Sequence, residues 1–286
     1  ASQELRGSGG TLKSIKRICE KFLQQTAESP VGELLRWRLL LLRISKDDVG
    51  AHQARWDGDE QILTYDDTEL RMDEVPKLLL LEYEQACELL YGELMFGAQQ
   101  LPRTHAWALR DNLDCDAFGW FFGLHRENAG LLEGRDRALR TVIQNSKPLR
   151  DSFLAETDGG GRIWRDKAVA LYETAADEFL KRLLVLIHMG AGQPLREPEL
   201  FSVTWRNSQR RRNIFIQHGL IMLYTTYHKG QQQTGAYKDN IRFLPSAVGD
   251  LLLDYIVHVI PLRQSFLRQS APKALISPYL DRKSVV

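Results

Sequence analysis

Residues 186–245 carry the pattern that most restricts how this chain can fold. An apolar helical run ends in the Gly-Ala-Gly of residues 190–192, and glycine commonly supplies the left-handed conformation that closes a helix. Arg196 and Glu199 follow, and then comes a basic segment rich in β-forming residues that ends in the Arg-Phe-Leu-Pro of residues 242–245. The order predicts a helix, a turn with an Arg-x-x-Glu pair, an antiparallel hairpin and another helix.

The remainder of the chain is typical of a helical scaffold. Apolar residues recur at helical spacing in five segments, which are residues 12–25, 34–44, 73–97, 134–150 and 167–189. Residues 61–72 instead alternate around a turn and predict a short hairpin. The expected fold class is therefore mainly α with a small antiparallel β-sheet (α+β).

The best linker in the sequence is the Asp-Gly-Gly-Gly of residues 158–161, because consecutive glycines lose the most conformational freedom on folding. It lacks the Lys-Ser/Thr that follows the glycines of a phosphate loop. We expect a helical N-terminal domain with a short hairpin over residues 1–160 and a second domain over residues 161–286. The sequence begins without Met and ends without a clear domain finish, so we expect a fragment of a longer protein.

Overall composition excludes few functions. Lys and Arg number 38 against 37 Asp and Glu, so only local charge can indicate a partner. Three separated cysteines form no Cys-x-x-Cys pair and predict buried thiols in a reducing, intracellular compartment. His105, Cys115 and His125 fit no standard zinc spacing, so we expect no metal and no cofactor. Charges interrupt the apolar helices, and no uncharged membrane span of about 20 residues remains.

Two segments concentrate positive charge. Between residues 206 and 242 the only acid is Asp239, and this segment predicts contacts with a phosphate backbone through Arg206, Arg210, Arg211, Arg212, Lys238 and Arg242. The helix predicted at residues 134–150 is also basic, and it could clamp DNA or simply present a solvated face. The aromatic residues of 107–122 could stack on bases, but core packing is the expected role.

The order of motifs in residues 186–245 resembles the first half of the catalytic domain of tyrosine recombinases (integrases). That family has a Gly-x-Arg-x-x-Glu-Leu motif, a lysine-bearing hairpin and an Arg-Val-Pro-Leu-Pro-like strand before a Leu-Leu-x-x-Tyr helix. The corresponding residues here are Arg196, Glu199, Lys229 in Tyr-His-Lys-Gly, and the helix start at 251–255. The His-Gly-Leu of residues 218–220 and the Tyr-His-Lys-Gly of residues 227–230 are also similar to the recombinase-like segment of fungal transposon-associated and telomere-linked helicase proteins.

The resemblance implies three catalytic roles. Arg196 would bind the scissile phosphate in a forked geometry, Glu199 would hold that fork, and Lys229 would protonate the leaving 5′-oxygen. The second half of the family pattern is missing, because no His-x-x-Arg follows residue 245. Tyr279, the last tyrosine, lies in a Pro-bounded segment that does not fit the nucleophile helix. We therefore expect no strand cleavage.

The expected function is that of a DNA-binding, truncated or degenerate recombinase-like protein of a fungal mobile element. Double-stranded DNA is the expected partner, the nucleus the expected compartment, and self-association or membership of a larger helicase-containing protein a further expectation. The alternative is a helical interaction protein, without enzymatic activity, whose basic hairpin binds an acidic protein partner.

Overall fold

The computed structural model describes residues 36–38, 40–41, 54–59, 61–65, 68–157, 160–225 and 239–280. The chain divides into two compact units, Ala1–Glu74 and Val75–Val286. In the first unit, β1 (Arg55–Trp56), β2 (Ile62–Tyr65) and β3 (Thr68–Arg71) form an antiparallel sheet in that order. This arrangement confirms the hairpin predicted at residues 61–72. Residues 36–38 and 40–41 are helical, whereas the helix predicted at residues 12–25 lies outside the described residues.

Most described residues belong to the second unit. Its longer helices are α3 (Glu74–Cys87), which starts at the unit boundary and continues as the π-helix η2 (Glu88–Leu94), α5 (Arg135–Asn145), α6 (Lys147–Phe153), α7 (Asp166–Gly190), α10 (Ser246–Asp254), the π-helix η6 (Tyr255–Val259) and α11 (Ile260–Ser270). Its shorter helices are η3 (Ala106–Ala108), η4 (Phe122–Leu124), η5 (Arg126–Asn128), α4 (Ala129–Leu132) and α8 (Glu197–Phe201). Its strands are β4 (Leu154–Glu156), β5 (Arg162–Trp164), β6 (Ile214–Gln217), β7 (Leu220–Thr225) and β8 (Asn240–Phe243).

The 25-residue helix α7 runs through the core of this unit, and it confirms the helix predicted at residues 167–189. Phe179, Leu183 and Ile187 recur every four residues and are 0% exposed, so one stripe of the helix is buried. Burying each such side chain stabilises the fold by about 1.5–3 kcal/mol. The helices η2 and α10 pack against α7, and the ring of Tyr255 lies 5.3 Å from that of Phe179.

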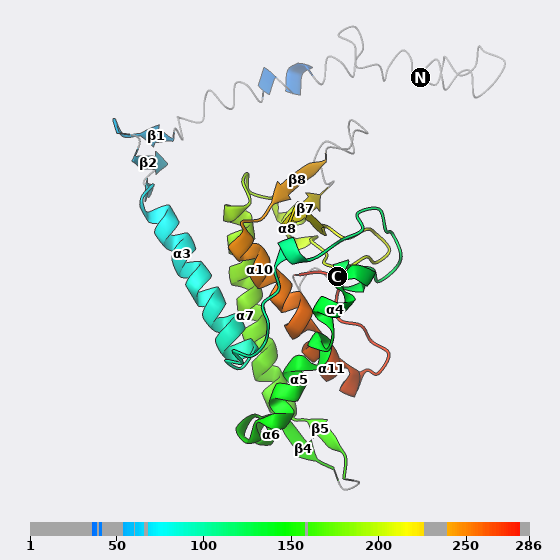
Figure 1. Cartoon of the computed structure of the whole chain (residues 1–286). Helices are drawn as coiled ribbons and strands as arrows, with labels where there is room; N and C mark the ends of the chain where they lie inside the picture. Colours follow the sequence, from blue (N-terminus) through cyan, green and yellow to red (C-terminus); the bar gives the residue numbers. More distant parts are fainter. Residues whose placement is uncertain are drawn as a thin grey trace, which may run out of the picture. The chain divides into compact units, whose positions relative to one another are not determined.

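Two small antiparallel sheets lie toward opposite ends of α7 (Figure 1). At one end β6, β7 and β8 form a meander in that order, which agrees with the strands predicted after Glu199. β6 and β7 are joined by His218 and Gly219, whose φ angles of 52° and 74° are of the kind that a two-residue type I′ turn requires. At the other end β4 pairs with β5, with Leu154 opposite Trp164.

The predicted linker at residues 158–161 falls inside the second unit, in the turn between β4 and β5. Residues 158 and 159 lie outside the described residues, but Thr157 donates its backbone N–H to the carbonyl oxygen of Gly161 at 2.8 Å. The turn therefore closes a hairpin inside the second unit, and the division of the chain into two compact units falls between Glu74 and Val75.

The aromatic segment is divided between core and surface. Phe122 is 0% exposed, as predicted, whereas Trp107 is 69% and Phe118 is 74% exposed, and for these two the core prediction is wrong. The physical reason is local: the segment is irregular, with only 3₁₀ turns, so it has no single face on which all its rings can be buried. Trp107 instead stacks on His105, with ring centroids 5.6 Å apart.

Candidate nucleic-acid interface

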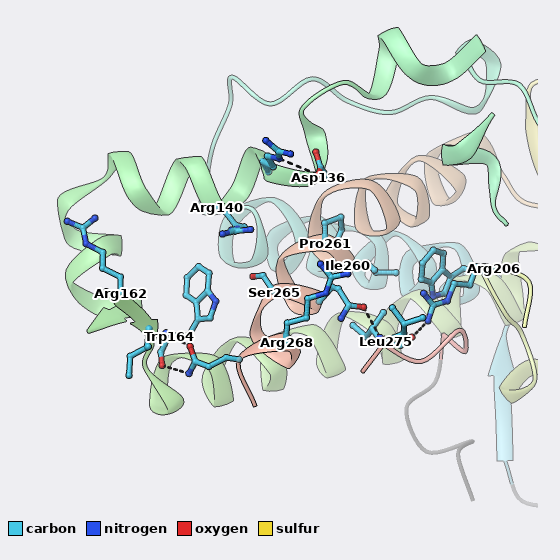
Figure 2. Close-up of a pocket in the computed structure, with 16 residues that line it drawn as sticks. Asp136, Arg140, Arg162, Trp164, Arg206, Ile260, Pro261, Ser265, Arg268 and Leu275 are labelled. Atoms are coloured by element: carbon cyan, nitrogen blue, oxygen red, sulfur yellow. Dashed lines mark hydrogen bonds and ion pairs between the residues drawn. The ribbon is translucent and has the colours of Figure 1, made fainter. Parts of the chain in front are cut away.

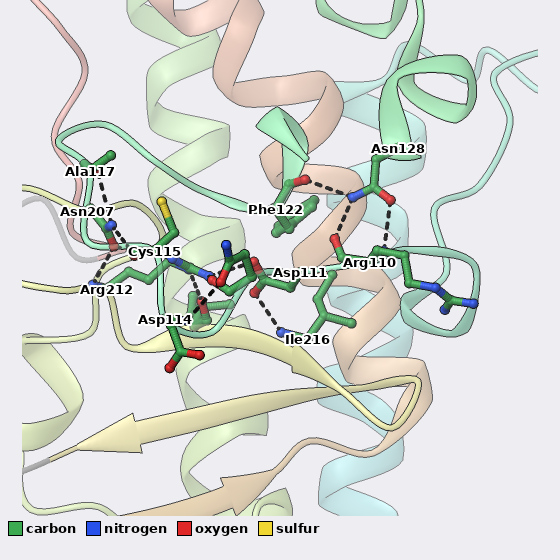
Figure 3. Close-up of polar contacts among 12 residues, drawn as sticks. Arg110, Asp111, Asp114, Cys115, Ala117, Phe122, Asn128, Asn207, Arg212 and Ile216 are labelled. Atoms are coloured by element: carbon green, nitrogen blue, oxygen red, sulfur yellow. Dashed lines mark hydrogen bonds and ion pairs between the residues drawn. The ribbon is translucent and has the colours of Figure 1, made fainter. Parts of the chain in front are cut away.

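Residues 202–213, called here the arginine loop, connect α8 to β6 and hold four of the predicted phosphate ligands. Buried polar side chains fix its backbone. Asn207 donates its Nδ2–H groups to the carbonyl oxygens of Cys115 (2.9 Å) and Ala117 (3.1 Å), as Figure 3 shows for the surrounding network. At the end of the loop the Oδ1 of Asn213 accepts hydrogen bonds from the N–H and the hydroxyl of Thr204. The loop is therefore held in one shape without regular secondary structure.

Arg212 is part of that internal scaffold. Its Nη2 lies 2.6 Å from the Oδ1 of Asp111, and both side chains are 0% exposed. Its Nε–H donates to the carbonyl oxygen of Ile214 at 2.9 Å. A guanidinium engaged in this way cannot reach a phosphate, so the prediction that Arg212 contacts nucleic acid is wrong. The reason is that a carboxylate distant in the sequence neutralises it inside the fold.

The other three arginines of the loop reach the surface. Arg210 and Arg211 are exposed. Arg206 is half-buried: its Nη2–H donates to the carbonyl oxygen of Ile276, and its guanidinium lies 4.9 Å above the ring of Trp205. Burial lowers the pKa of Arg206, because a charged group loses hydration there. These three side chains remain candidate phosphate ligands.

Arg196 and Glu199 are neighbours, but their contact differs from the predicted one. Arg196 is exposed at the N-cap of α8, and its backbone N–H donates to the Oε2 of the buried Glu199 at 2.9 Å. This contact is the glutamate half of a capping box; an arginine side chain has no acceptor and cannot supply the other half. Among the described contacts, Glu199 holds the backbone at the start of α8 and does not orient the guanidinium group of Arg196.

Arg242, on β8, is only 8% exposed. Burial lowers its pKa, while the negative charge of Glu199 opposes that change. The side chain is therefore turned into the protein, and the prediction that Arg242 contacts a phosphate is wrong. Lys229 and Lys238 lie outside the described residues. The structure thus brings Arg196 and Glu199 together, and the predicted lysine stays a prediction.

A concave site that the sequence did not reveal lies between α5, β5, the arginine loop and α11. Figure 2 shows this cleft, which has a volume of about 780 Å³. We call it the arginine cleft, because five arginines line it against one carboxylate, that of Asp136: Arg137, Arg140, Arg162, Arg206 and Arg268. Its partial signal in the sequence was the basic helix at residues 134–150, which contributes Arg137 and Arg140.

The walls of the arginine cleft are fixed by hydrogen bonds. The Oε1 of Gln269 accepts from the backbone N–H of Trp164 at 2.6 Å, and its Nε2–H donates to the carbonyl oxygen of the same residue at 2.9 Å. Gln264 in turn accepts from the N–H of Ile276 at 2.9 Å. Guanidinium groups donate pairs of parallel hydrogen bonds, and on walls held in place in this way they are suited to binding phosphate oxygens.

The described residues offer no group of three His, Cys, Asp or Glu side chains that could hold a metal ion. No helix in the described part of the chain has the length and apolar character needed to cross a bilayer. No protein-family model matches the sequence, and no solved structure matches the fold.

Proposed function

We propose that this chain binds double-stranded DNA through its phosphate backbone and does not cut it. One observation carries the proposal: Arg210 and Arg211 project from a loop whose backbone is fixed by the buried Arg212–Asp111 pair. A fixed loop reduces the entropy lost when the arginines bind, and exposed guanidinium groups pair well with phosphate oxygens.

The order of elements supports the same proposal. A long helix, a short helix with Arg196 at its start, a three-stranded antiparallel sheet and a further helix follow one another in the order that the recombinase resemblance implies. We propose that the chain is a degenerate recombinase-like segment from a fungal mobile element, part of a larger helicase-containing protein, and that it acts in the nucleus. Arg196 would contact a phosphate in the bound DNA.

Fluorescence anisotropy with a blunt-ended duplex of about 20 base pairs tests the proposal. We expect the logarithm of affinity to fall linearly with the logarithm of salt concentration, with a slope of about −0.9 per phosphate neutralised. Replacing Arg210 and Arg211 by Glu should weaken binding at least about ten-fold and reduce the magnitude of that slope by about 2.

Arg126→Glu is the matched control, because Arg126 is also exposed but lies on η5, outside both the arginine loop and the arginine cleft. It should retain duplex affinity within about two-fold. Equal loss in the control and the loop variant would show that only overall charge matters. Displacement of the duplex by polyglutamate at an equal concentration of charges would favour an acidic protein partner and would overturn the proposal.

A further inference from the structure

The arginine cleft carries positive charge that the described residues do not neutralise. Arg140, Arg162 and Arg268 pair with no carboxylate in the described part of the chain. The one carboxylate of the cleft, Asp136, lies 3.7 Å from Arg137 in an exposed pair. Concentrating like charges in a concave surface raises the local positive potential, which attracts an anion of matching shape.

Arg206 adds a second, independent indication. Its guanidinium is partly removed from water, yet among the described contacts its hydrogen-bond partner is a backbone carbonyl and not a carboxylate. A partly desolvated cation that lacks an opposite charge is stabilised when an anionic ligand supplies one. The ring of Trp205 beneath it limits where the guanidinium can move.

The cleft is elongated. In Figure 2, Arg162 and Arg206 lie at opposite ends, and Arg140 and Arg268 lie between them. One side is formed by the 11-residue helix α11, which is about 16 Å long at 1.5 Å per residue. Spread over that length, a volume of about 780 Å³ corresponds to a half-open cleft roughly 7 Å across for the centres of bound atoms, or about 10 Å between its walls. A compact phosphate compound would contact only part of such a row.

This width selects among the forms of nucleic acid. A duplex is wider than its own major groove of about 12 Å, so it cannot enter the cleft and could only lie across its open side. One strand can lie in it with several consecutive phosphates facing the arginines. The indole rings of the cleft are committed to packing: that of Trp164 lies 4.9 Å from Phe266, and that of Trp205 lies 5.1 Å from Phe121. Trp205 is also buried beneath Arg206 and Trp164 is only partly exposed, so the arginines and not the rings dominate the surface of the cleft.

We propose that the arginine cleft binds one single strand of nucleic acid along α11, through its phosphates and without sequence preference. The inference rests on the proposed function in that both ligands are nucleic acids, but it assigns the strand to a site separate from the exposed tips of Arg210 and Arg211. Arg140 and Arg268 contact the middle of the strand, and Arg162 and Arg206 contact its ends.

The test measures anisotropy of a labelled thymidine oligonucleotide of about 12 nucleotides, alongside the blunt duplex, between 50 and about 200 mM salt. The cleft variant carries Arg140→Glu and Arg268→Glu, both at exposed positions, so its thermal unfolding should match that of the native protein. We expect it to lose at least about ten-fold in strand affinity, and the salt slope to fall in magnitude by about 1.4. Its duplex affinity should stay within about two-fold.

The loop variant R210E/R211E should show the reverse pattern, with strand affinity kept within about two-fold and duplex affinity lost. Absence of strand binding by the native protein, or equal loss of both ligands in the cleft variant, overturns the separate strand site. Displacement of the strand by tripolyphosphate at equal phosphate concentration shows a small-polyphosphate site and also overturns it. Strand binding that depends on the cleft, without any duplex binding, would sustain this inference while the proposed function fails.

Discussion

Arg212 and Asp111 lie 101 positions apart in the sequence, yet their side chains meet at 2.6 Å with no exposed surface on either. The second carboxylate oxygen of Asp111 accepts the backbone N–H of Ile216 at 3.1 Å, so the same residue also holds the start of the sheet (Figure 3). One carboxylate thus fixes both the arginine loop and the strand that follows it.

Asp111→Asn should be strongly destabilising. The substitution keeps the shape of the side chain but leaves the guanidinium of Arg212 buried without an opposite charge, which costs about 3–5 kcal/mol. Urea unfolding should show this loss as a lower midpoint. Arg211 precedes Arg212 in the sequence but is exposed, so Arg211→Ala should change the free energy of unfolding by less than about 0.5 kcal/mol. An Asp111→Asn protein as stable as the native one would contradict the structural role of the pair.

Gly219→Ala should destabilise the hairpin of β6 and β7. The φ angle of Gly219 is +74°, and a Cβ there would lie 3.3 Å from the Cα and Cβ of Trp107. Left-handed backbone alone costs an alanine about 1–2 kcal/mol. The midpoint of thermal unfolding should fall, and the emission of Trp107 should shift. Gly130→Ala is the control, because its site has no atom within 4 Å and lies in α4, where alanine is favoured.

Asp254 and His258 should influence stability in opposite directions as the pH changes. Burial raises the pKa of Asp254 from 3.8 to about 6, although hydrogen bonds from Thr104 oppose the shift. Burial also lowers the pKa of His258 from 6.5 to about 4. Between about pH 4 and pH 6 the folded protein holds a proton on Asp254 that the unfolded chain releases. The unfolded chain meanwhile holds a proton on His258 that the folded protein excludes.

As the pH falls from about 6 to 4, the contribution of Asp254 to stability therefore rises while that of His258 declines, and the two nearly cancel. Asp254→Asn removes the first contribution, so its free energy of unfolding should decline by about 3 kcal/mol between pH 6.5 and 4 relative to the native profile. Urea titrations across this range measure the difference. The control Asp114→Asn changes an exposed carboxylate and should keep the native dependence of the free energy of unfolding on pH. The same dependence in Asp254→Asn would show that Asp254 does not oppose the effect of His258.

Supercoiled plasmid should stay supercoiled when incubated with this chain. Tyr279 is half-buried and itself forms a β-bridge with Thr204, and residues 246–286 contain no His-x-x-Arg to complete the phosphate-binding set. Gel electrophoresis would reveal relaxed circles if strands were cut. Relaxation that Tyr279→Phe abolishes would contradict the proposal that the protein binds without cleaving.

Local patterns in the sequence predicted several of the longer helices of the second unit and the strands that follow Glu199. The apolar stripe of residues 167–189 and the Gly-Ala-Gly after it predicted α7 and its end at Gly190, because hydrophobic period and helix-closing glycine agree. The order of a turn with Arg196 and Glu199, antiparallel strands and the helix α10 was also predicted, although the turn is in fact the short helix α8. The hairpin between β4 and β5 was not, because a glycine run marks a tight turn as well as a linker.

The roles of individual arginines could not be predicted, since they depend on partners far away in the chain. Arg211 and Arg212 are adjacent and chemically identical, but Asp111 neutralises only the second. The strand that follows gives no periodic signal, because Ile214, Phe215 and Ile216 are all buried. The arginine cleft was missed for the same reason: its lining arginines come from four separate elements that only the fold brings together.

Gln269 uses both polar ends of its amide to bind the backbone of Trp164, as a neighbouring strand would. Those N–H and C=O groups on the outer edge of β5 are thereby withdrawn from pairing with another chain. An open strand edge is a common starting point for aggregation, and a single side chain that imitates a peptide group protects this one. Replacing Gln269 would therefore endanger the solubility of the protein before it affected the stability of the core.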